Sequence, residues 1–179
     1  MKIWWQSSTA IHRLDDYRNT LTKNLNELKR PDVEVHVNGV DDGSMDLHYN
    51  SIVAMNSYGV GGVLNKLMQA DEQGYDAIAI GCFLDPAMQE AREIVKIPVL
   101  GLGECTMLMA CMYGYKFSGI AFHKKQSQYY DRKAFEYGLS SRHIPFGDLG
   151  IDFTEVQKAF TNPGQMTENF LKESRRLAA

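Results

Sequence analysis

Short apolar runs alternate with segments of helical period over roughly the first 105 residues, and this alternation limits the possible folds more than any other feature of the sequence. The run Ala77-Ile78-Ala79-Ile80 is typical of a strand buried on both faces. The predicted strands are residues 3–5, 33–37, 77–80 and 97–100, and the predicted helices between them lie at 14–28, 60–68 and 86–95. Strands separated by helices in this way require a parallel sheet with right-handed crossovers, covered by helices on both faces. We therefore expect an α/β fold built on a parallel sheet.

The remaining residues predict a second α/β unit with fewer strands. Its predicted elements are strands at 117–122 and 141–146, a helix between them with Tyr130, Ala134 and Tyr137 on one face, and helices at 154–160 and 165–177. The apolar stretch 106–112, which precedes this unit, predicts a buried helix.

The last predicted helix places Met166, Phe170 and Leu177 on one face, and no later strand follows to receive that face. We expect residues 1–112 to form the first α/β domain, and residues 113–179 to form a partial, truncated second α/β domain. We expect residues 117–179 either to pack against another polypeptide, a continuation or a second copy of the chain, or to be much more mobile than residues 1–112. A homo-oligomer is also expected.

Charge and hydropathy exclude several classes of protein. Lys and Arg total 19 against 22 Asp and Glu, so the net charge of −3 has the wrong sign for a nucleic-acid surface. No apolar run approaches the roughly 18 residues that span a bilayer, and the first residues turn polar too soon for a signal peptide. We expect a cytoplasmic protein that binds neither nucleic acid nor membrane.

The sequence also lacks the usual patterns for metals and nucleotides. Its three cysteines, Cys82, Cys105 and Cys111, form neither a CxxC pair nor an even-numbered disulfide set. The glycines at 59, 61 and 62 do not directly follow a strand, so they are a poor dinucleotide fingerprint. We expect no metal and no cofactor.

In a parallel α/β sheet the ligand site lies at the carboxyl ends of the strands. This rule singles out residues 6–9, 81–85 and 101–104, which each follow a predicted strand directly. Cys82 would lie between a strand end and the helix predicted to start at Asp85-Pro86, a position that favours a reactive thiolate. A charged Asp85 nearby would oppose thiolate formation, and a small buried apolar residue is the alternative role for Cys82. Cys105 and Cys111 lie in an apolar context that favours simple packing.

The other candidate site residues have equally ordinary alternatives. The candidates for substrate binding are Gln6, Ser7, Ser8, Phe83, Glu104 and His123. The serine hydroxyls could bind a carboxylate or imide oxygen, or cap a helix. Glu104 could face the site or cap the helix that follows it. His123, at a strand end, could be a general acid or base, or an exposed loop histidine.

Four segments resemble the aspartate/glutamate racemase superfamily, and within it the hydantoin racemase branch. They are Asp76 to Phe83, Asp85-Pro86, Ala91-Arg92-Glu93 and Pro98 to Glu104, and the opening residues 3–7 are similar to one group of that branch. The resemblance is strongest from residue 76 to about residue 112.

The resemblance implies a cofactor-independent racemase or isomerase of two similar α/β domains, acting on a small carbon acid such as an amino acid, a hydantoin or a related carboxylate. In that family one cysteine from each domain faces the substrate's α-carbon, because inversion needs proton removal on one face and delivery on the other. Cys82 matches the first cysteine, and no residue of this sequence matches the second. A decarboxylase or a cis-trans isomerase of small dicarboxylates, or a non-catalytic small-acid binding module, therefore remains an alternative.

Overall fold

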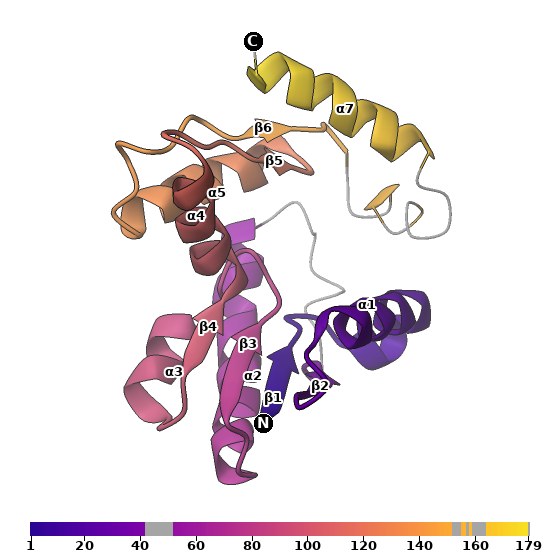
Figure 1. Cartoon of the computed structure of the whole chain (residues 1–179), viewed down its shortest axis with the longest axis vertical. Helices are drawn as coiled ribbons and strands as arrows, with labels where there is room; N and C mark the ends of the chain where they lie inside the picture. The colour runs from indigo at the N-terminus through magenta and orange to yellow at the C-terminus, as the bar shows by residue number, and fades with distance from the viewer. Residues whose placement is uncertain (42–51, 152–154, 157, 159–163, 179) are drawn as a thin grey trace. The chain divides into compact units, whose positions relative to one another are not determined.

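The computed structural model describes residues 1–41, 52–151, 155–156, 158 and 164–178. The chain separates into two compact units (Figure 1). The first comprises the described residues of Met1–Leu47 and Ala54–Cys105, and the second those of His48–Val53 and Thr106–Ala179. The domain division expected at residue 112 remains a prediction.

The first unit is built on a parallel sheet, which confirms the α/β fold expected from the sequence. Its strands are β1 (Lys2–Gln6), β2 (Glu34–Asn38), β3 (Ala77–Ile80) and β4 (Val99–Gly101), in the order β2-β1-β3-β4. All three pairings are parallel. Trp4, Ile78 and Ile80 are almost completely buried, so the two middle strands supply much of the apolar core.

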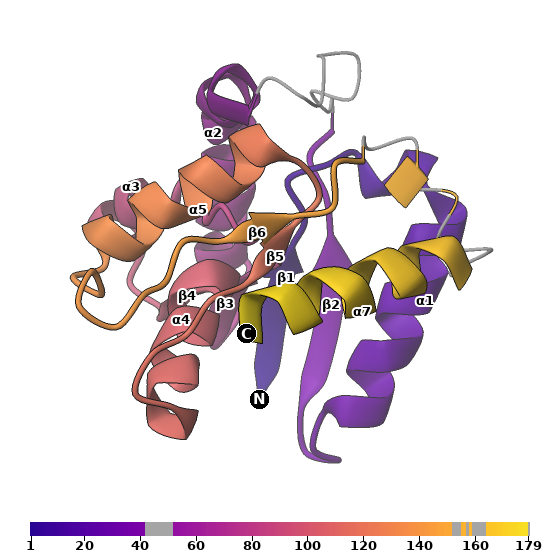
Figure 2. The same cartoon turned by 90° about the horizontal axis from the view of Figure 1, so that it is seen from above.

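Helices connect and flank these strands. They are a short 3₁₀ helix η1 (Ile11–Arg13), α1 (Asp15–Leu28), α2 (Ile52–Glu72), α3 (Met88–Ile94) and α4 (Leu102–Tyr113). Helix α1 contacts β2 and α3 contacts β4, at opposite edges of the sheet (Figures 1 and 2). Gly74 follows the end of α2 with φ of +72°, a conformation that favours glycine. In the described part of the chain, no helix is both long and apolar enough to cross a membrane.

The predicted start of a helix at Asp85-Pro86 was wrong. The N-cap of α3 is Ala87, with φ of +59°, and Asp85 also has a positive φ of +48°. The two residues lie in a turn before the helix, because the Asp85 carboxylate accepts hydrogen bonds from the first turn of α4 instead of capping α3.

The second unit contains a two-stranded parallel sheet of β5 (Ile120–Ala121) and β6 (Gly147–Asp148), with α5 (Lys124–Glu136) and α7 (Gly164–Ala178). The strand predicted at 117–122 is therefore shorter than expected, and the strand predicted at 141–146 was wrong. Between residues 117–119 and 141–146 the structure has one isolated bridge, which joins Phe117 to His143. Pro145 has no N–H to donate to a strand ladder, and regular pairing resumes only at Gly147. Tyr130 and Ala134 are buried on α5 as predicted.

Helix α7 contacts both β5 and β6, so part of its apolar face packs on strands that precede it in the sequence. The side chains of Glu173 and Leu177 lie directly over Gly147. Phe170 remains 49% exposed. Of the helix predicted at 154–160, only residues 155–156 and 158 are described, and they are helical; the rest lies outside the described residues.

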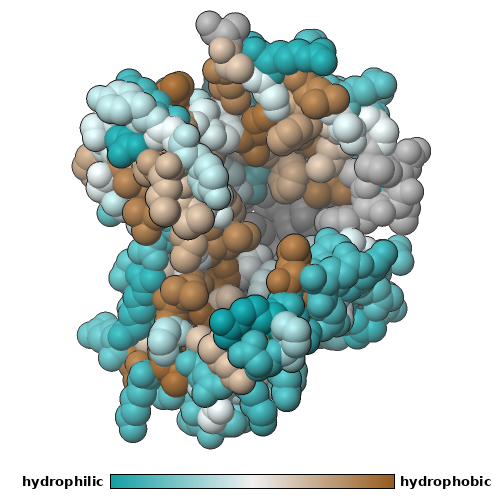
Figure 3. Space-filling model, viewed as in Figure 1, coloured by the Kyte–Doolittle hydropathy of each residue, from teal (hydrophilic) through white to brown (hydrophobic). Residues whose placement is uncertain are grey.

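The prediction that residues 106–112 form a buried helix was correct for the helix and wrong for the burial. Met107 is 1% exposed, whereas Met112 is 78% exposed. Apolar side chains lie on several sides of α4, and the described residues cover only one of them. Hydrophobic groups accordingly reach the surface around β4 and α4 (Figure 3).

Candidate functional site

The four strands of the first unit end at a common edge, where the predicted loops begin. Gln6 pairs with Asn38 on one side and with Ile80 on the other, and Ile80 pairs with Gly101. Beyond the last pairs, the Ser7 N–H donates to the Asn38 carbonyl and the Gly81 N–H donates to the Gln6 carbonyl, both at 2.8 Å. The loops after β1 and β3 therefore run side by side.

Cys82 lies two residues beyond the last residue of β3 and is partly buried. The side chain of Ser8 and the backbone N–H of Leu84 hydrogen-bond to its sulfur. Burial raises the pKa of the Cys82 thiol above its ordinary value, and the nearby charge of Asp85 raises it as well, while the two hydrogen bonds lower it. The net direction is upward, so the group is a neutral thiol at neutral pH.

This result corrects one expectation and confirms another. The position of Cys82 does not favour a thiolate, because desolvation outweighs the hydrogen bonds and α3 begins only at Met88. The expected opposition from Asp85 is confirmed as a contributing cause.

Ser7 and Tyr17 bring two further hydroxyl groups to the same edge. Ser7 is 2% exposed, shares a hydrogen bond of 2.8 Å with the Thr9 hydroxyl, and accepts the Thr9 N–H at 3.1 Å. The Tyr17 hydroxyl, on α1, hydrogen-bonds to Ser7. Burial raises the pKa of Tyr17, and so does its electrostatic interaction with Cys82, which places the phenol in the surroundings of the thiol.

Gln6 is fully buried and bonded locally. Its side-chain oxygen accepts from Trp4 Nε1 at 2.7 Å, and its side-chain nitrogen donates to the Ser7 carbonyl at 2.7 Å. These bonds fix the end of β1 from inside the core. A substrate-binding role for Gln6 remains a prediction beside this structural one.

Gly81, immediately before Cys82, is required by the close approach of an aromatic ring. The indole of Trp5 occupies the space that a Cβ on Gly81 would take. A larger residue here would displace either the ring or the Cys82 loop.

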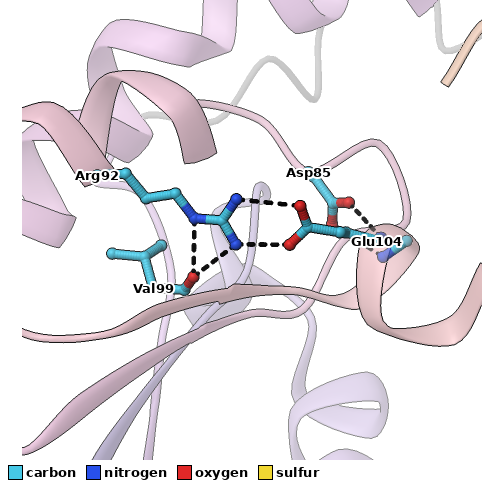
Figure 4. A network of polar contacts seen from close by, with 5 residues as sticks. Asp85, Arg92, Val99 and Glu104 are labelled. Carbon is cyan, nitrogen blue, oxygen red and sulfur yellow. Dashed lines mark hydrogen bonds and ion pairs between the residues drawn. The ribbon is translucent and has the colours of Figure 1, made fainter. Parts of the chain in front are cut away.

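Asp85 and Glu104 link the Cys82 loop to the elements beyond β4 (Figure 4). The Asp85 oxygens accept the backbone N–H groups of Gly103 at 2.9 Å and Glu104 at 2.7 Å. The Glu104 carboxylate binds Arg92 of α3, which also donates twice to the carbonyl of Val99. The side chain of Glu104 is therefore engaged in an ion pair, and its predicted contact with a substrate remains a prediction.

The remaining candidates are distributed between the two units. Phe83 lies in the Cys82 turn, and its carbonyl group lies close to Gly103. His123 belongs to the second unit, where it is the N-cap of α5 and its carbonyl accepts the N–H groups of Gln126 and Ser127. The substrate roles of Phe83 and His123 remain predictions. Among the described residues there is no group of three or more potential metal ligands.

Two features of this site were not predicted from the sequence. Tyr17 lies in the helix predicted at 14–28, and the leucine spacing of that helix gives no sign that its hydroxyl has a buried partner. Arg92 was noted only as part of a motif, although it forms the ion pair with Glu104. A spacing pattern predicts which face of a helix is buried, and does not identify the partner of a polar atom on that face.

A parallel sheet with helices between its strands, and with a thiol and several hydroxyl groups at its carboxyl edge, defines this molecule as an α/β protein. The sequence profile of the family described as Asp/Glu/Hydantoin racemase matches residues 22–179. The chain belongs to this family, and the resemblance to its hydantoin racemase branch is confirmed.

Individual relatives agree with the family assignment. The hydantoin racemase of Pseudomonas sp. (strain NS671) is 29% identical over 96 residues, which are 51% of this chain and 39% of the relative. The hydantoin racemase of Rhizobium meliloti is 33% identical over 84 residues, or 47% and 34% of the two chains. These alignments thus span well under half of either relative. The allantoin racemase of Klebsiella pneumoniae has the same fold, with a TM-score of 0.83 at 20% identity, covering 98% of this chain and 68% of that one.

Proposed function

We propose that this chain takes part in the racemisation of a small carbon acid, such as a 5-substituted hydantoin, with Cys82 moving the proton at the α-carbon and with no cofactor. The observation that carries the proposal is the position of the Cys82 thiol at the carboxyl end of β3, bonded to Ser8 and to the N–H of Leu84. Membership of the racemase family and the names of the two aligned relatives support it.

The chemistry needs two groups on opposite faces of the α-carbon. A base on one face takes the proton, the C–H electron pair delocalises into the neighbouring carbonyl, and an acid on the other face delivers a new proton to carbon. A raised pKa makes Cys82 a neutral thiol, so in the resting state it is suited to deliver the proton. Its sulfur becomes a thiolate as its proton moves to carbon, while the opposite base has become protonated. We assign no residue to the opposite face.

Hydrogen exchange at the α-carbon tests the proposal directly. The chain is incubated with a 5-substituted hydantoin in D₂O, deuterium at C5 is followed by NMR, and inversion is followed by circular dichroism. Deuterium should enter faster than in buffer alone, and Cys82→Ser should lower the excess rate by about 100-fold or more, because a hydroxyl is a far weaker acid than a thiol. Cys105→Ser is the matched control and should retain the rate. Near-normal exchange in Cys82→Ser would refute the assignment.

A non-catalytic small-acid binding protein is the second candidate, because an inert cysteine would also have a raised thiol pKa caused by burial. Calorimetric titration with the same hydantoin separates the two candidates. Binding without exchange above the buffer rate would favour the binding protein.

A further inference from the structure

The turn that carries Cys82 is closed by a buried acidic residue. Asp85 is 3% exposed, and its backbone N–H donates to the Cys82 carbonyl at 3.0 Å. Its φ of +48° lies in the left-handed region, which Asp and Asn tolerate better than most other residues with a side chain. The conformation is maintained because the side chain is bonded at its far end.

The Asp85 carboxylate is bonded to the first turn of α4. The Asp85 carboxylate accepts N–H bonds from Gly103 and Glu104 with its two separate oxygens. A Cβ on Gly101 would lie 2.5 Å from the Asp85 Cγ, and one on Gly103 would clash with the carbonyl of Phe83. The Cys82 turn and the start of α4 are therefore in direct contact, and the contact depends on glycine at both positions.

The same geometry determines which charges act on the thiol. Among the described residues, the titratable groups with an electrostatic interaction with Cys82 are the Asp85 carboxylate, in its own turn, and the Tyr17 phenol, on α1. The N–H groups of Gly103 and Glu104, in the first turn of α4, could stabilise an anion, but they donate to Asp85. These N–H groups therefore stabilise the negative charge of Asp85 and do not stabilise a negative charge on the Cys82 sulfur.

We propose that Asp85 is the positioning residue of the Cys82 site: its carboxylate fastens the turn that carries the thiol to the first turn of α4 and keeps a negative charge beside the thiol. The inference rests on the proposed function and deepens it by assigning a role to a residue in the same turn as the reacting sulfur. It concerns the thiol of the unliganded chain, so its test does not depend on turnover.

The test measures the alkylation rate of each cysteine against pH. The full chain is pulsed with iodoacetamide between about pH 6 and pH 11, and peptide mass spectrometry quantifies Cys82 and Cys105 separately. Asp85→Asn removes the charge, retains an acceptor oxygen and suits the positive φ. We expect it to raise the alkylation rate of Cys82 near pH 8 by about threefold or more, with the midpoint moved to lower pH.

Glu104→Gln is the matched control, since it neutralises a neighbouring carboxylate that lies in the first turn of α4. Glu104 raises the pKa of Cys105, whereas Asp85 acts on both cysteines. Glu104→Gln should therefore move the Cys105 midpoint and leave Cys82 unchanged, while Asp85→Asn moves both. A Cys82 midpoint that is unchanged in Asp85→Asn, or moved equally by Glu104→Gln, would overturn the proposal.

A looser fold would also speed alkylation, so the plateau rate at high pH is compared as well. A higher plateau with an unmoved midpoint indicates loosening and counts against the proposal. If Asp85→Asn does not fold, Asp85→Ser provides the test, because it also removes the charge and keeps a hydrogen-bond acceptor: it must move the Cys82 midpoint to lower pH, and an unmoved midpoint overturns the proposal. Loss of hydantoin exchange alone would reject the proposed function and leave this inference standing.

Discussion

Arg92 on α3 binds both carboxylate oxygens of Glu104 on α4, at 3.0 Å from Nη1 to Oε1 and 2.5 Å from Nη2 to Oε2. The same guanidinium donates from Nε and Nη2 to the carbonyl oxygen of Val99 on β4, at 3.1 and 3.0 Å. One side chain thus joins two helices and a strand behind the Cys82 turn. Its planar, forked shape is what allows four bonds at once.

Replacing Arg92 by Lys should lower the free energy of unfolding by about 1 to 2 kcal/mol, because an ammonium group retains the charge and loses the paired geometry. Urea denaturation measures the change. Arg18→Lys is the control, since Arg18 pairs with Asp15 at an exposed position on α1, and its effect should stay within about 0.5 kcal/mol. Equal effects at the two sites would show that the fork at Arg92 contributes nothing.

Two glycine-to-alanine changes should shift stability in opposite directions. Gly81→Ala places a Cβ inside the Trp5 ring and should lower the free energy of unfolding by about 2 kcal/mol or more. Gly61→Ala lies in α2, with open space around the new Cβ, and should raise it by roughly 0.5 to 1 kcal/mol. Thermal unfolding of both variants checks the pair, and a neutral Gly81→Ala would contradict the packing of Trp5 described above.

Tyr17→Phe should lower the free energy of unfolding by about 1 kcal/mol, because it removes the hydroxyl bonded to the buried Ser7. Tyr113→Phe, at a side chain that is 87% exposed, should change nothing measurable. If Tyr17 also contacts the substrate, Tyr17→Phe should weaken hydantoin binding more than its stability cost explains. Titration calorimetry well below the unfolding temperature measures that second effect.

The pH dependence of stability should carry a contribution from Cys82. Its pKa in the folded chain is raised above the value in the unfolded chain, so the folded chain retains the thiol proton to higher pH. The contribution is fully present below the unfolded pKa of about 8.5 and is lost as pH rises through the folded pKa.

The free energy of unfolding should therefore fall above about pH 8.5, and the fall should be shallower in Cys82→Ala. Part of the slope should remain in that variant, because burial also raises the pKa of Cys105. Urea titrations at a series of pH values measure both slopes. An identical slope in Cys82→Ala would show that the thiol is not held neutral by the fold.

The order of strands and helices in the first unit followed from the sequence alone. The run at Ala77 to Ile80 and the spacing of leucines from Leu14 to Leu28 are local signals, since period and apolarity depend only on neighbours along the chain. The rule that sites form at the carboxyl edge of a parallel sheet then placed Cys82, Ser7 and Ser8 together correctly.

The tertiary structure decided which partner each polar group has. Asp85 lies at the predicted start of the helix beside it, where its side chain could act as an N-cap, and instead it binds N–H groups of Gly103 and Glu104, 18 and 19 residues further along the chain. Local preference for a cap is worth about 1 kcal/mol, so two bonds to another helix, one buried and one partly buried, outweigh it.

Contacts made by the tertiary structure also explain the protonation state of Cys82. The sequence determined that the thiol follows a strand at the ligand edge of the sheet. Whether the thiol is charged depends on desolvation, on Asp85 and on the bonds from Ser8 and Leu84, which exist only once the loops after β1 and β3 lie side by side. Electrostatics acts through space, so the fold decided what the order of residues along the chain did not.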